Sequence, residues 1–241
     1  MARRRRFLLV VIVAAFAATT FSAPVAAARR KKRRRHPAAA LAALAAPAAE
    51  PPPLPSDAVR PYQASYDHEL TGRFTDSIRD LDDLPAAEQE SYVGRLRRGW
   101  LLYRAGRHSE SVDAYRQAIA LDKGSVEARV GSLLPLIALR RWADVEQAAR
   151  AALDLDPANY LAGLRLAFAI YSRGRYSEAE GLYRRVLAHY PSDADARAGL
   201  GWSLLKQGKP SIARQAFLAA SRTAPRSPTV LEGLTATGRA Q

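Results

Sequence analysis

The sequence predicts an all-α protein in which short helix pairs stack into a solenoid, and three periodic series of residues support this prediction. A turn signature recurs every 34 residues, starting at Gly72, Gly106, Arg140, Gly174 and Gly208. A second series has the same period, at Leu81, Tyr115, Ala149, Tyr183 and Phe217. A third closes the later units, at Pro157, Pro191 and Pro225. Self-similarity at a fixed period of about 20–50 residues is typical of repeat architectures.

The chain starts with a segment that has the order of an export signal. Arg3 to Arg6 precede the uncharged stretch 7–28, which begins with large apolar residues and ends with small ones. This is the order of the n-region, h-region and cleavage region of a signal peptide. Because the stretch is also long enough to cross a bilayer, an uncleaved anchor is the alternative. Residues 1–28 are therefore predicted to be a signal peptide or a signal anchor.

A run of basic residues follows directly, at Arg29, Arg30, Lys31, Lys32, Arg33, Arg34 and Arg35. The run could hold the C-terminal side in the cytoplasm, bind anionic lipid headgroups, or bind nucleic acid. Its position after an export-like segment favours the first two, and so favours membrane contact over nucleic-acid contact. The formal net charge of +14 is concentrated in this N-terminal region, because the rest of the chain is nearly balanced.

Residues 37–57 consist mostly of alanine and proline. Such a composition cannot bury a core, and its prolines keep the backbone extended. Residues 29–57 are therefore predicted to form a basic cluster and a disordered linker that tethers the rest of the chain.

The periodic part divides into five units with a short helix after them. Each unit offers a helix, a short turn and a second helix, and the later units end at a proline. Residues 228–241 begin one more helix, which we expect to cap the stack. A helix pair alone cannot bury its apolar side, so neighbouring units have to stack. The units cover residues 58–227, as 58–91, 92–125, 126–159, 160–193 and 194–227.

This pattern of glycine, small, aromatic and proline positions resembles the tetratricopeptide repeat family. The resemblance covers about residues 58–227 and implies a right-handed superhelix whose concave groove holds peptides. Two units depart from the family pattern. The first has a short second helix stopped by Pro85, and the third has Arg140 in place of the turn glycine.

The sequence offers no recognisable site for catalysis or for a cofactor. Without cysteine there is no disulfide, no thiolate metal site and no cysteine nucleophile. The four histidines are not spaced as metal ligands, and the serines lack a partnered base. We therefore expect no enzyme activity, no bound metal and no cofactor.

A candidate binding face lies on the first helix of each unit, where the fifth, ninth and twelfth residues share one side. The resemblance implies that this side lines the groove; alternatively, its aromatic residues only extend the core between adjacent helices. Arg97 and Arg165 lie at neighbouring positions and, with the other cations, favour acidic residues in the partner. The candidate partner-binding residues are Tyr66, Trp100, Tyr103, Arg104, Phe168, Tyr171, Trp202 and Lys206.

These observations together predict a protein-interaction scaffold in the cell envelope of a bacterium, with the solenoid exported to or facing the periplasm. Its expected ligand is an apolar or aromatic peptide or protein segment with some acidic character. Bacterial origin is inferred from the Ala/Arg-rich composition and the export signal. The alternative topology is a membrane anchor facing the cytoplasm. The alternative function is binding of nucleic acid or anionic lipid through residues 29–35.

Overall fold

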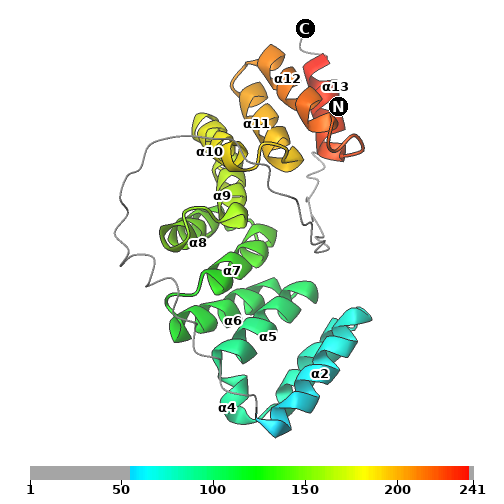
Figure 1. Ribbon diagram of the computed structural model, residues 1–241, viewed down its shortest axis with the longest axis vertical. Helices are drawn as coiled ribbons and strands as arrows, with labels where there is room; N and C mark the ends of the chain where they lie inside the picture. Colours follow the sequence, from blue (N-terminus) through cyan, green and yellow to red (C-terminus); the bar gives the residue numbers. More distant parts are fainter. Residues whose placement is uncertain (1–54, 239–241) are drawn as a thin grey trace, which may run out of the picture. The chain divides into compact units, whose positions relative to one another are not determined.

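The computed structural model describes residues 55–238, a range that contains helices and no β-strand (Figure 1). The predicted all-α solenoid is confirmed for this part of the chain. The signal segment predicted at 1–28, the basic residues 29–35 and most of the predicted linker lie outside the described residues. Within 55–238, no helix combines the length and the apolar character that crossing a bilayer requires.

The helices follow one another as antiparallel pairs. The described part of the chain begins with α2 (Ser56–Leu70) and α3 (Phe74–Asp80), followed by the 3₁₀ turn η1 (Leu81–Asp83) and the short α4 (Ala86–Gln89). We call α2, α5, α7, α9 and α11 the first helices, and their partners the second helices. The later pairs are α5 (Tyr92–Arg104) with α6 (His108–Leu121), α7 (Val126–Ala138) with α8 (Trp142–Leu155), α9 (Tyr160–Ser172) with α10 (Tyr176–His189), and α11 (Ala194–Lys206) with α12 (Pro210–Ser221), before a final α13 (Pro228–Gly238).

A capping residue fixes where each regular first helix begins. The side chains of Ser91, Ser125, Asn159 and Asp193 accept a hydrogen bond from the backbone N–H three residues later. Such a bond satisfies one of the amides that a helix leaves free in its first turn. These four caps are themselves 34 residues apart, so the period also sets the start of each helix.

Two residues after the end of each first helix, one residue has a left-handed backbone conformation. Gly72, Gly106, Gly174 and Gly208 have φ between 75° and 79°, and the equivalent residue of the third unit, Arg140, has φ of 57°. The backbone N–H groups of Arg140 and Arg141 bond the carbonyls of Ile137 and Leu136, as Gly106 and Arg107 bond Tyr103 and Leu102. Arg140 therefore forms the glycine turn despite its Cβ, which costs free energy.

The stacking of pairs rests on a buried aromatic ring placed against glycines. Tyr115, Tyr183 and Phe217 are at most 3% exposed. A Cβ added at Gly131 would lie 2.5 Å from the ring of Tyr115, one at Gly199 would lie 2.2 Å from that of Tyr183, and one at Gly233 would lie 2.3 Å from that of Phe217. Each ring belongs to a second helix and each glycine to the next helix along the stack. The absence of a side chain thus lets the ring reach the backbone of the following unit.

Each second helix packs mainly on the first helix of the next unit, and neighbouring first helices also touch each other. Helices α5 and α7, α7 and α9, and α9 and α11 touch each other directly, and α11 also touches α13. The second helices of neighbouring pairs touch each other far less. Since first helices approach more closely than second helices do, they line the inner side of the curved stack.

The first unit departs from this regularity as its sequence predicts. Helix α3 has seven residues, and Leu81 and Leu84 continue its buried side through η1 and the segment before Pro85. The side-chain amide of Gln89 donates to the carbonyls of Asp82 and Leu84 at 2.9 and 2.8 Å. These bonds hold the shortened second helix and α4 in place of a full helix.

We expect Arg140→Gly to stabilise the protein by about 1 kcal/mol, because glycine removes the Cβ strain of the left-handed turn. Urea unfolding followed by circular dichroism measures the change. Gly106→Arg, the mirror-image control at the same position of the second unit, should destabilise the protein by a similar amount. An unfolding midpoint of Arg140→Gly at or below that of the parent chain would contradict this account of the turn.

We expect Gly199→Ala to destabilise the protein by about 1–3 kcal/mol, since its methyl group overlaps the ring of Tyr183. Gly181→Ala is the matched control, because no atom lies within 4 Å of a Cβ added at this helical glycine. There, alanine should stabilise by about 1 kcal/mol through its higher helix propensity. We expect the two thermal unfolding midpoints to shift in opposite directions. Shifts in the same direction would argue against a close contact between the ring of Tyr183 and the backbone of Gly199.

Candidate functional site

The candidate site is the inner face, by which we mean the side of the first helices that carries the second, fifth, sixth, ninth, twelfth and thirteenth residues of each unit. Aromatic and cationic side chains gather on it towards both ends of the stack. The ninth residues are Tyr66, Trp100, Leu134, Phe168 and Trp202, and the twelfth are Glu69, Tyr103, Ile137, Tyr171 and Leu205. Except for the exposed Tyr66, all of these ninth and twelfth side chains are half-buried.

At the N-terminal end, Glu69 gathers three of the neighbouring side chains. It pairs with Arg97 at 2.5 Å, accepts a hydrogen bond from the indole N–H of Trp100 at 2.5 Å, and lies 3.9 Å from Arg104. The guanidinium of Arg97 also stacks on Tyr66, 3.6 Å from the ring centre. Of the predicted site residues, Trp100 and Arg104 contact Glu69 directly. Tyr66 joins the same cluster through Arg97, and Tyr103 joins it through Trp100.

The expectation that Arg97 offers a free charge to a partner is wrong. Arg97 is 8% exposed, and its guanidinium bonds Glu69 and the hydroxyl of Ser65. A charge that is removed from water and neutralised by its own chain attracts a second carboxylate only weakly. Arg104, by contrast, is exposed and lies over the rings of Phe74 and Trp100.

The predicted residues of the fourth unit contact aromatic residues of second helices. Phe168 meets Trp142 of α8 edge to face, with 5.6 Å between ring centres, and Tyr171 lies 5.3 Å from Tyr176 of α10. Burial raises the pKa of Tyr171 to about 12, so its hydroxyl stays protonated and remains a hydrogen-bond donor at neutral pH. These two side chains pack in part against the core and in part face solvent.

At the C-terminal end, Trp202 packs on Phe217 at 5.4 Å and donates its indole N–H to the carbonyl of Thr229 at 3.2 Å. Helix α13 therefore covers the polar edge of this tryptophan. Lys206 is exposed, and no carboxylate of residues 55–238 pairs with it.

Arg165 lies near the middle of the inner face, on α9. It is half-buried and donates one hydrogen bond, at 3.0 Å, to the backbone carbonyl of Val130. Burial lowers the pKa of its guanidinium, while Tyr103, Tyr115 and Tyr160 partly offset that effect. Within the described part of the chain, no carboxylate forms an ion pair with Arg165.

The structure adds three exposed apolar residues that the sequence pattern did not include. Val59, Val93 and Leu161 are the second residues of their units, and they are 52%, 49% and 37% exposed. Each precedes a ninth-position residue by seven positions, a spacing that places both on one helical face. Extending the pattern from i, i+4, i+7 back by one more turn would have found them.

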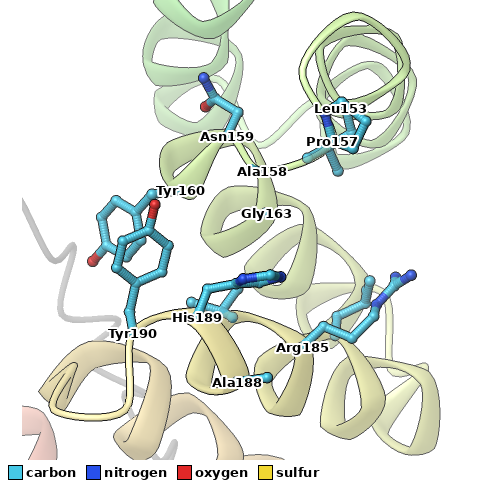
Figure 2. Close-up of a pocket in the computed structure, with 12 residues that line it drawn as sticks. Leu153, Pro157, Ala158, Asn159, Tyr160, Gly163, Arg185, Ala188, His189 and Tyr190 are labelled. Atoms are coloured by element: carbon cyan, nitrogen blue, oxygen red, sulfur yellow. The ribbon is translucent and has the colours of Figure 1, made fainter. Parts of the chain in front are cut away.

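A separate pocket of about 330 Å³ lies away from these residues, between the loop after α8 and helix α10. Figure 2 shows Tyr160 and Tyr190 side by side on one flank, with His189 and Arg185 along the other. The two tyrosine rings meet edge to face at 4.8 Å, and Tyr160 donates a hydrogen bond to Asp193 at 2.6 Å. Both contacts lie within the fourth unit, and Asp193 also caps α11, the first helix of the fifth. The pocket is therefore a gap between packed helices, and its aromatic wall has a structural role.

The chain belongs to the tetratricopeptide repeat family. The sequence model of this family matches residues 62–126, 136–194 and 171–228. Members of this class are helical repeat scaffolds for protein interaction, and the structure has that architecture.

One curated protein is similar in sequence, and several solved structures share the fold. The chain is 34% identical over 125 residues to the Protein CTR9 homolog of Arabidopsis thaliana, covering 52% of this chain and 11% of that protein. Among solved structures, MamA 41-end from Desulfovibrio magneticus RS-1 aligns with a TM-score of 0.67 at 14% identity, covering 73% of this chain and 99% of that one. YrrB, described as a TPR protein with an unusual peptide-binding site, aligns with a TM-score of 0.62 at 14% identity, covering 74% and 92%.

We expect Glu69→Gln to destabilise the protein by about 3 kcal/mol, because it leaves the buried guanidinium of Arg97 without a counter-charge. Asp113→Asn is the control, since it breaks an exposed pair with Arg116 and should cost less than about 1 kcal/mol. Chemical denaturation of both variants measures the difference. Equal small losses would mean that Arg97 is not held by Glu69 in solution.

Proposed function

We propose that this protein is a non-catalytic interaction scaffold of the bacterial cell envelope, which binds a segment of a partner protein along its inner face. The observation that carries the proposal is the row of aromatic and apolar side chains that stay partly accessible there. Exposed or half-buried aromatic residues, together with the exposed Val59, Val93 and Leu161, form an apolar surface. A contiguous apolar surface in contact with water is typical of an interaction site.

The chemistry of the face favours an apolar or aromatic ligand with acidic residues. Large rings supply contact area at a small cost in conformational entropy, and tyrosine hydroxyls add hydrogen bonds. Arg104 and Lys206 add positive charge at the two ends. The proposed contacts are Tyr66, Trp100, Tyr103, Arg104, Phe168, Tyr171, Trp202 and Lys206. The peptide-binding site for which YrrB is described, on the same fold, supports this mode of binding.

The proposed location rests on the N-terminal sequence. An export-like segment at 1–28 and basic residues 29–35 would place the solenoid at a membrane, facing the periplasm, with the linker as spacer. An anchored protein facing the cytoplasm is the competing topology. A reporter fused at Gln241 distinguishes the two, because a reporter active only in the cytoplasm contradicts export.

The seven consecutive basic residues support a second candidate function, in which residues 29–35 bind anionic lipid or nucleic acid and the repeats serve assembly. Vesicles with and without phosphatidylserine, and a DNA duplex, would be compared at two salt concentrations. Affinity that disappears when residues 29–35 are deleted would support this candidate.

We expect Leu161→Asp to weaken the binding of peptides that are selected on the full-length protein from a random display library. Fluorescence anisotropy measures the affinity, and a loss of about tenfold or more is expected for a residue at the centre of the interface. Ile212→Asp is the matched control, since Ile212 is similarly exposed, at 49%, in the first turn of second helix α12. If both variants bind alike, the inner face is not the binding surface.

A further inference from the structure

The inner face contains two arginines at the sixth position of a unit, Arg97 and Arg165, which lie two repeats apart. The sixth residue of a unit follows the residue that holds a buried ring in the preceding second helix. After the rings of Tyr115, Tyr183 and Phe217, the sixth residue is a glycine, namely Gly131, Gly199 and Gly233. Where Leu81 or Ala149 stands in place of the ring, the sixth residue of the next unit is an arginine, Arg97 or Arg165. The two arginines therefore occupy equivalent places in the stack, which makes their surroundings directly comparable.

Both terminal nitrogens of the Arg97 guanidinium have partners, whereas its buried Nε has none among the described residues. The twelfth residue of the preceding unit, Glu69, supplies a carboxylate at 2.5 Å, and the eighth, Ser65, supplies a hydroxyl at 3.1 Å. A guanidinium has five N–H donors in a fork that matches a carboxylate. Glu69 thus shows where a carboxylate fits against an arginine at this position of the fold.

The surroundings of Arg165 lack these partners. The residues equivalent to Glu69 and Ser65 are Ile137 and Leu133, whose side chains accept no hydrogen bond. The carbonyl of Val130 is bound by one nitrogen of the guanidinium. Among residues 55–238 no carboxylate pairs with Arg165, although it is half-buried and its pKa is lowered by that burial. A partly dehydrated cation of this kind gains more from an anion than an exposed cation does.

We propose that Arg165 is the specificity-determining residue of the inner face and binds the side-chain carboxylate of an Asp or Glu in the partner, at the place that Glu69 occupies beside Arg97. The inference rests on the proposed function of the inner face. It names a side chain rather than a chain terminus because α9 has first helices on both sides, α7 and α11, and a segment lying along the face continues past this point. Val93, Leu161 and Phe168 would contact apolar residues flanking that carboxylate.

A test within the protein needs no ligand. Ile137→Glu copies Glu69 and should pair with Arg165, whereas Ile137→Gln has the same shape without the charge. We expect the thermal midpoint of Ile137→Glu to exceed that of Ile137→Gln by about 2 °C or more at neutral pH. In the Arg165→Met background this difference should vanish. A midpoint of Ile137→Glu no higher than that of Ile137→Gln would overturn the proposal, because a carboxylate would then not fit beside Arg165.

A second test uses peptides selected on the full-length protein and shown by Leu161→Asp to bind the inner face. Each acidic residue is replaced by its amide, in peptides with free or amidated C-termini. We expect one acidic side chain to contribute about tenfold or more in affinity to the parent protein and nothing to Arg165→Met or Ile137→Glu. Dependence on the free C-terminus instead would overturn the assignment to a side chain.

The two proposals fail in different ways. If Leu161→Asp weakens the binding of none of the selected peptides, the inner face does not bind them and the proposed function fails. If peptides bind there but Arg165→Met retains the full preference for the acidic form, the scaffold function stands and the role of Arg165 is wrong. Arg165→Met is used only if its helical signal and midpoint match those of a folded chain; otherwise the Ile137 variants decide between the outcomes.

Discussion

The close approach of aromatic rings to glycine backbones determines the shape of this solenoid. Tyr115, Tyr183 and Phe217 are buried against glycines of the following unit, at distances that leave no room for a Cβ. Burying such a ring contributes free energy that a single helix pair cannot obtain. The same contact brings first helices together while second helices stay apart, so the inner face and its curvature follow from the packing of the core.

The sequence predicted the fold because every unit repeats the same physical constraints. The turn glycines, the small residues and the positions of the buried rings each recur every 34 residues. The same structural reason therefore applies to each unit. Arg140 shows the strength of this rule, since the surrounding bonds of the third unit hold it in a glycine conformation. The caps Ser91, Ser125, Asn159 and Asp193 had the same period and could have been found in the same way.

The state of the site could not be predicted in the same way, because it depends on pairs of residues in different units. Arg97 is neutralised by Glu69, 28 positions earlier, and only the first unit has an acidic residue at that place. Whether an aromatic residue faces solvent or core also depends on its neighbours. Trp202 is held by α13 through Thr229, whereas Tyr66 remains exposed although it occupies the same position of its unit.

Under the proposed function, the positions where this chain departs from its own period carry the information about binding. Aromatic side chains along the inner face would provide affinity, but they would bind many apolar segments and would not fix where a segment begins or ends. A single half-buried guanidinium is more selective, because its forked N–H donors bind an anionic oxygen pair such as a carboxylate in a fixed orientation. Arg165 stands between Gly131 and Gly199 in the series of sixth residues. In the proposed mode of binding, it would set the register of a bound segment, and the rings on either side would determine how tightly that segment is held.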